Sequence, residues 1–92
     1  MKQNEMPKVK KGSLLEFIVK ENGGVPNKGY EVVGYYRGLV ENPLNQNKPG
    51  EKVVCLTSNN SRDGGNNVYI GFEGQNGYSF LIAKKIRLIK KG

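Results

Sequence analysis

Residues 30–41, YEVVGYYRGLVE, hold the longest strand-like pattern in this chain of 92 residues. Side chains on a β-strand point alternately to opposite faces. On this basis one face carries Tyr30, Val32, Tyr36 and Val40, and the other carries Glu31, Val33, Tyr35, Arg37, Leu39 and Glu41. Gly34 and Gly38 interrupt the first face, and glycine lets a strand bend sharply or another backbone approach closely. The pattern predicts a long, strongly curved strand.

The segment before this strand also alternates. Residues 14–20 (LLEFIVK) place Glu16 and Lys20 on one face, and the opposite face carries Leu15, Phe17 and Val19. This is the period of a half-buried strand. Asparagine, glycine and proline then gather over residues 22–27, where they favour a turn. The sequence therefore predicts a strand over 14–20 that ends in a turn.

Two polar segments separate the long strand from the later elements. Residues 42–50 contain two prolines and are expected to form a loop that leads to a buried strand at 52–58 (KVVCLTS). Residues 59–67 (NNSRDGGNN) contain no apolar side chain. This segment is either a mobile tip or a contact loop.

The last third of the chain shows further strand patterns. Residues 68–73 alternate, and the side chains expected to point inward are Val68, Ile70 and Phe72. Asn76-Gly77 predicts a tight hairpin turn into a strand at 78–82. Residues 83–85 are expected to form one helical turn, and residues 86–89 the closing strand.

These segments together indicate an all-β domain. Five or six short strand patterns, turn signals at regular intervals and the lack of a helical period favour a small barrel or sandwich. A chain of this length forms one domain, which we expect to span residues 13–92. Residues 1–12 lack an apolar period and contain Pro7. They are expected to form a flexible basic arm.

The strand layout and the ending YSFLIAKKIRLI resemble the SH3-like small barrels, a group that includes Tudor-type and KOW-type domains. The resemblance implies an SH3-like barrel of five or six strands that binds nucleic acid or protein, with a basic N-terminal arm and a basic C-terminal tail. An OB-type barrel is the alternative fold, although no segment corresponds to its usual intervening helix.

The residue types that most catalytic and metal sites need are scarce. The chain has no histidine and a single cysteine, so it offers no intrachain disulfide, no multi-cysteine metal site and no histidine-activated nucleophile. Cys55 lies in an apolar strand, where we expect a structural thiol. No apolar run is long enough for a membrane span or a signal peptide. We expect a cytoplasmic protein that is not an enzyme and needs no cofactor or metal.

The net charge of +7 is concentrated at the two ends. If the first and last strands pair, as in small closed barrels, the ends would lie together and present one positive field to an anionic partner. Alternation also puts Lys85 and Arg87 on one side, in a row that can follow a phosphate backbone. The candidate phosphate contacts are Lys10, Lys11, Lys84, Lys85, Arg87, Lys90 and Lys91. The alternative interpretation is solubility and protection of a strand edge.

Tyrosines beside arginine supply candidate contacts to bases. Tyr35 and Arg37 share a face of the long strand, and Tyr69 lies opposite Ile70 in its own strand, so these three side chains could stack on bases. The same face of the long strand is also apolar enough to meet a protein. The candidate protein contacts are Val33, Tyr35, Leu39, Arg62 and Asp63.

Three functions fit these features. The first is binding of DNA or RNA through the basic ends, with strong salt dependence and little sequence specificity. The second is a small inhibitor or regulator, of the kind a phage encodes, that docks onto an acidic protein through the apolar face or the polar loop. The third is capture of an anionic nucleotide between subunits. The sequence leaves open the choice among them and whether the protein forms a homodimer.

Overall fold

The alternation in residues 14–20 becomes a strand in the computed structural model of the chain. This strand, β1 (Leu14–Asn22), buries Leu15, Phe17 and Val19 completely, as expected. The structure describes residues 2, 6, 8–22, 25–26, 29, 31–41, 50–58, 67–75 and 81–92. Among them the further strands are β2 (Val25–Pro26), β3 (Glu31–Glu41), β4 (Lys52–Ser58), β5 (Asn67–Gly71) and β6 (Leu81–Lys90).

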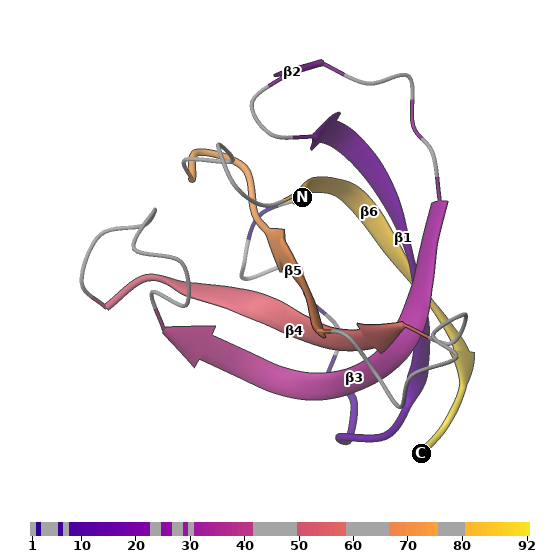
Figure 1. Cartoon of the computed structure of the whole chain (residues 1–92). Helices are drawn as coiled ribbons and strands as arrows, with labels where there is room; N and C mark the ends of the chain where they lie inside the picture. The colour runs from indigo at the N-terminus through magenta and orange to yellow at the C-terminus, as the bar shows by residue number, and fades with distance from the viewer. Residues whose placement is uncertain are drawn as a thin grey trace.

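Five of these strands close into a barrel (Figure 1). The sheet runs from β1 through β3, β4 and β5 to β6, and β6 pairs again with β1. The remaining strand, β2, adds two residues beside the end of β1. None of the described residues is helical. The predicted all-β class is confirmed, as a closed five-stranded barrel with one extra strand.

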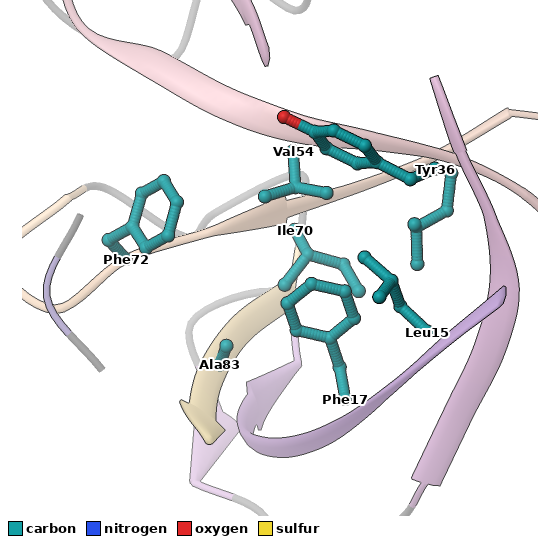
Figure 2. Close-up of a cluster of buried hydrophobic side chains, with 8 residues drawn as sticks. Leu15, Phe17, Tyr36, Val54, Ile70, Phe72 and Ala83 are labelled. Atoms are coloured by element: carbon teal, nitrogen blue, oxygen red, sulfur yellow. The ribbon is translucent and has the colours of Figure 1, made fainter. Parts of the chain in front are cut away.

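The barrel interior is filled by side chains from all five strands of the closed sheet. The main cluster consists of Leu15, Phe17, Tyr36, Val54, Leu56, Ile70, Phe72 and Ala83, seven of which are labelled in Figure 2. Burial of one large apolar side chain stabilises a fold by about 1.5–3 kcal/mol. Because this cluster draws on every strand of the closed sheet, its burial holds the sheet closed.

β4 is buried on both faces, which explains its continuous apolar sequence. Val54 and Leu56 point into the barrel, whereas Val53 and Cys55 lie on the outer face, the side of the sheet that points away from the interior. All four side chains are buried. A second cluster covers part of the outer face and consists of Val53, Ile82, Val40 and Tyr69. The predicted buried strand is confirmed.

β3 contains a β-bulge in its second half. Tyr36 pairs with Leu56, but the next paired residue is Gly38, opposite Cys55, so Arg37 is an extra residue in the register. Gly38 has a φ of 106°, a conformation that costs glycine little because it has no Cβ. An inserted residue of this kind bends the strand and increases its twist.

The bulge reverses the direction of the side chains that follow it. Leu39 packs against the interior cluster, and Val40 packs in the outer cluster with Val53. The expected placement of Leu39 on the outer face and of Val40 on the inner face is therefore wrong. One extra residue shifts an alternation of period two by one position and turns every later side chain to the other face.

β6 is one continuous strand where the sequence predicted a helical turn followed by a short strand. Ala83 pairs with Val19 and Lys85 pairs with Ile18, so Lys84 is an extra residue at a register shift. The helical turn predicted at 83–85 is wrong. A bulge and a helical turn both break the apolar alternation, and the sequence pattern does not separate them.

β5 and β6 run parallel and share only two pairs, Ile70 with Leu81 and Gly71 with Ile82. A two-residue turn joins antiparallel strands only. The predicted hairpin between strands at 68–73 and 78–82 is therefore wrong, and Asn76-Gly77 itself lies outside the described residues. This junction is the shortest one within the closed sheet.

The described part of the N-terminal arm is packed on the barrel. Met6 and Val9 are partly buried against the interior cluster. The backbone N–H of Ser13 donates to the carbonyl of Lys10 at 3.1 Å, which turns the chain into β1. These contacts fix where the arm lysines lie relative to the strands.

Candidate functional site

Pairing of β1 with β6 brings the two ends of the described chain to one side of the barrel. Leu14, at the start of β1, lies opposite Lys90, at the end of β6. The backbone N–H of Gly92 donates to Ser13 Oγ at 3.1 Å. Figure 1 shows the start of β1 close to the yellow C-terminal end. A joint positive field from the two ends requires the first and last strands to pair, and β1 and β6 do pair.

A cavity of about 290 Å³ lies between the arm and the end of β6. Its described lining consists of Lys8, Val9, Lys10, Ser13, Leu88, Lys91 and Gly92, with no aspartate or glutamate side chain among them. Lysines from both ends of the chain therefore meet at one place, which we call the end cavity. The sequence pattern indicated Lys10 and Lys91 but not Lys8 or Leu88, because only the folded chain brings these four residues together.

The outer face of β6 carries Lys85 and Arg87 on the same side, as their alternation predicts. Arg87 lies opposite Glu16 on β1, and its Nε donates to Glu16 Oε1 at 3.1 Å. The Arg87 side chain is 70% exposed and that of Glu16 is 12% exposed. One positive charge of the row is therefore partly compensated, while its guanidinium remains accessible to solvent.

A second, larger cavity of about 480 Å³ lies along this outer face. Its described charged lining residues are Glu16, Glu31, Lys85 and Arg87. Two carboxylates thus accompany two basic groups. An anion would meet repulsion here as well as attraction, so this mixed groove is a weaker anion site than the end cavity.

Tyr35 lies on the same outer face as the basic side chains of β6. Its cross-strand neighbours are Leu14 on β1 and Thr57 on β4, and Leu14 in turn lies beside Lys90. The ring is 42% exposed. Two strand spacings separate Tyr35 from Lys90, or roughly 10 Å between their Cα atoms. An exposed ring and a basic side chain therefore share one surface.

Arg37 and Tyr69, the other two candidates for base contacts, are held by the sheet in different ways. Arg37 Nε donates to Thr57 Oγ1 at 2.9 Å, and the Arg37 residue is exposed. Tyr69 lies opposite Cys55 and packs against the outer cluster that contains Val53 and Ile82. Arg37 is thus oriented next to Tyr35, whereas Tyr69 is half-buried and takes part in packing.

Two of the candidate lysines lie away from the end cavity and the β6 row. The Lys11 side chain covers Gly38, where an added Cβ would lie 2.9 Å from Lys11 Cε. Lys84 is exposed at the register shift in β6. The seven candidate basic residues therefore do not form one continuous cluster; they divide between the end cavity, the β6 outer face and these separate positions.

The predicted protein-contact surface changes most. Val33 lies on the outer face opposite Glu16 and is half-buried, and Tyr35 remains beside it. Leu39 leaves this surface because of the bulge in β3. Arg62 and Asp63 lie outside the described residues. What remains is a smaller apolar surface than the sequence suggested.

Cys55 shows the features expected of a packed thiol. It is 5% exposed, and burial raises its thiol pKa, partly offset by the positive charge of Arg37. Among the residues that the structure describes, no three histidine, cysteine, aspartate or glutamate side chains gather where they could hold a metal ion. Within the same residues no helix has the length and apolar character that crossing a bilayer requires.

Comparisons of the chain with protein-family models, with curated proteins and with solved structures found no match.

Proposed function

We propose that this protein is a non-enzymatic module that binds nucleic acid through the basic surface formed by the two chain ends and β6. The observation that carries the proposal is the pairing of β1 with β6, which places lysines from both ends around one cavity. Positive charge gathered at one place attracts a polyanion more strongly than the same charge spread evenly.

The outer face next to the end cavity supports this proposal. Lys85, Arg87 and Lys90 follow β6 at the edge of a surface that also carries Tyr35. Basic groups that contact phosphates beside an aromatic ring that can stack on a base are the usual components of single-strand binding surfaces. Phosphate contacts of this kind give affinity with little sequence specificity.

Within the class of small barrels, the proposal corresponds to the SH3-like type whose Tudor and KOW members bind nucleic acid or protein. The chain has a single cysteine, Cys55, which is buried and forms no disulfide; this cysteine usage is typical of proteins in a reducing compartment, and we propose a cytoplasmic location. Both assignments are part of the proposal, and a nucleic-acid target in the cytoplasm is accessible to such a protein.

The proposal is tested by fluorescence anisotropy of labelled single- and double-stranded DNA and RNA over a series of salt concentrations. We expect a log–log slope of about −3 to −5, which corresponds to roughly four to six phosphate contacts. The variant K90Q/K91Q should flatten the slope by about 1.4 on a single strand. K52Q neutralises an exposed lysine on β4 away from the ends. It should leave the slope within about 0.7 of the value for the unmodified protein. The absence of binding at low salt would disprove the proposal.

One observation favours a second candidate function, the binding of an acidic protein. Large apolar side chains are exposed at the end of β6 and on β2, where Leu88 is 38%, Ile89 44% and Val25 65% exposed. If this function applies, I89Q should weaken capture of the partner, and K90Q/K91Q should leave most of the capture intact. If the protein instead binds nucleic acid, K90Q/K91Q should weaken binding more than I89Q does.

A further inference from the structure

We infer that the end cavity binds a phosphate monoester, the group found at the 5′-phosphorylated end of a nucleic-acid strand and in a free mononucleotide. The inference rests on the proposed function and makes it more specific, since it assigns one subsite to a terminal phosphate. It follows from the charge, the hydrogen-bond donors, the size and the apolar wall of the cavity.

No aspartate or glutamate side chain lies among the described residues that line the cavity. Lys8, Lys10 and Lys91 line it, and none of the three has a carboxylate partner among the described residues. By contrast, Arg87 of the outer face has Glu16 at 3.1 Å. Three neighbouring ammonium groups repel one another, so a ligand that carries close to two negative charges relieves more repulsion than one with a single charge.

Ser13 adds a buried polar group to the lysines. It is 2% exposed and lines the cavity. Its Oγ accepts a hydrogen bond from the Gly92 N–H at 3.1 Å, and within the described part of the chain the hydroxyl proton has no acceptor. A buried donor without an acceptor is unfavourable. A phosphate oxygen in the cavity would accept a hydrogen bond from the Ser13 hydroxyl. A surface formed by lysines alone would lack this hydroxyl donor.

The number of donors matches a terminal phosphate better than an internal one. A phosphate monoester presents three terminal oxygens and carries a charge of about −1.5 to −2 at neutral pH. An internal phosphodiester carries one charge and has two such oxygens. Three ammonium groups and one hydroxyl can therefore satisfy the monoester more completely.

The size and the wall of the cavity agree with a single end group. Its volume of about 290 Å³ lies just below the range for ligand pockets, about 300–1,000 Å³. Val9 and the partly exposed Leu88 form apolar lining next to the lysines. A sugar or base attached to the phosphate can contact them, whereas an extended strand would continue along β6 outside the cavity.

The test compares two oligonucleotides of one sequence, one with a 5′-phosphate and one with a 5′-hydroxyl, each labelled at the 3′ end. Three solvent-accessible ion contacts of ordinary strength predict about tenfold tighter binding of the phosphorylated strand at physiological salt. K10Q and K91Q should each reduce this preference about twofold, and the double variant K10Q/K91Q about fivefold. K52Q carries the same charge change away from the cavity and should retain the full preference.

A second measurement locates the phosphate and identifies its source. Backbone amide NMR shifts are recorded during titration with adenosine monophosphate, with adenosine and with inorganic phosphate. Shifts at Ser13, Leu88 and Gly92 with adenosine monophosphate but not with adenosine support the inference. If adenosine monophosphate also abolishes the preference for the phosphorylated strand, the free mononucleotide and the strand end both bind in the cavity. If adenosine monophosphate neither shifts these amides nor competes with the phosphorylated strand, while that strand keeps its preference, the strand end alone is the ligand.

Failure of this inference is distinguishable from failure of the proposed function. Equal affinity for the two strands, together with no amide shifts around the cavity, overturns the inference while binding of the 5′-hydroxyl strand still measures the proposed function. Conversely, localised shifts with adenosine monophosphate and no binding of either strand refute the proposed function and leave a mononucleotide site.

Discussion

Replacement of Glu16 by glutamine should make the protein slightly less stable and a better nucleic-acid binder. Glu16 is the carboxylate that accepts a hydrogen bond from Arg87 Nε at 3.1 Å on the outer face of β1 and β6. Glutamine keeps the size and a hydrogen-bond acceptor but removes the charge. The guanidinium of Arg87 is then released from its ion pair and becomes available to a phosphate.

The expected magnitudes follow from the exposure of the two groups. Because the Arg87 side chain is 70% exposed, solvent screens the pair, and its loss should lower the free energy of unfolding by only about 0.5 kcal/mol. For a domain of this size that corresponds to a decrease in Tm of roughly 2–4 °C. One additional phosphate contact should steepen the log–log salt slope by about 0.7 on single-stranded DNA. Affinity at physiological salt should rise about two- to fivefold.

Anisotropy titration of a labelled single strand over a salt series measures both changes in binding, and thermal unfolding measures the stability. The matched control is E41Q, which changes the net charge equally but lies at the far end of β3, opposite Lys52. If E16Q and E41Q tighten binding to the same extent, net charge and not the release of Arg87 is responsible. If E16Q leaves both affinity and slope unchanged, the outer face of β6 is not part of the interface.

Three further predictions concern the fold that carries the site. G34A should lower the free energy of unfolding by about 1–3 kcal/mol in urea denaturation, since its Cβ would lie 2.7 Å from the carbonyl oxygen of Thr57; an unchanged midpoint would contradict this close approach. L39A should lower the free energy of unfolding by about 1–2 kcal/mol, more than Y35A does, because the bulge turns Leu39 to the interior. A larger loss of stability in Y35A than in L39A would refute the bulge. Burial raises the pKa of Cys55 above its ordinary value of 9.0, so the unfolded chain loses the thiol proton at a lower pH than the folded one. Stability should therefore fall as pH rises above about 9, more steeply than in C55A, and parallel pH curves would argue against a buried thiol.

Much of the barrel was predictable from local pattern. The alternation of Leu15, Phe17 and Val19 gave the buried face of β1, and the apolar run around Cys55 gave a strand buried on both faces. Period-two alternation works for such segments because a strand directs its side chains by backbone geometry alone. The same rule failed for Leu39, since the extra residue in β3 is recognised only through its pairing with β4.

The end of the chain shows a second limit of local pattern. A break in alternation around Lys84 was predicted as a helical turn, and the structure has a continuous strand with a register shift. The candidate site was predictable in a similar, partial way. Charge counts identified Lys10 and Lys91, but the cavity also needs Lys8 and Leu88, whose proximity depends on contacts between segments about eighty residues apart.

By itself, the sequence determined the all-β class, the inward faces of the regular strands, and a net positive charge concentrated at the two ends. Each of these depends on residue identity or on short-range backbone geometry, which a linear pattern records. Only the tertiary structure decided which strand pairs with which, where one extra residue reverses a face, and that Lys8 and Lys91 line one cavity. Those outcomes depend on closing the sheet, where β6 must find β1 across the whole chain, and the free energy of that pairing comes from side chains distant in sequence.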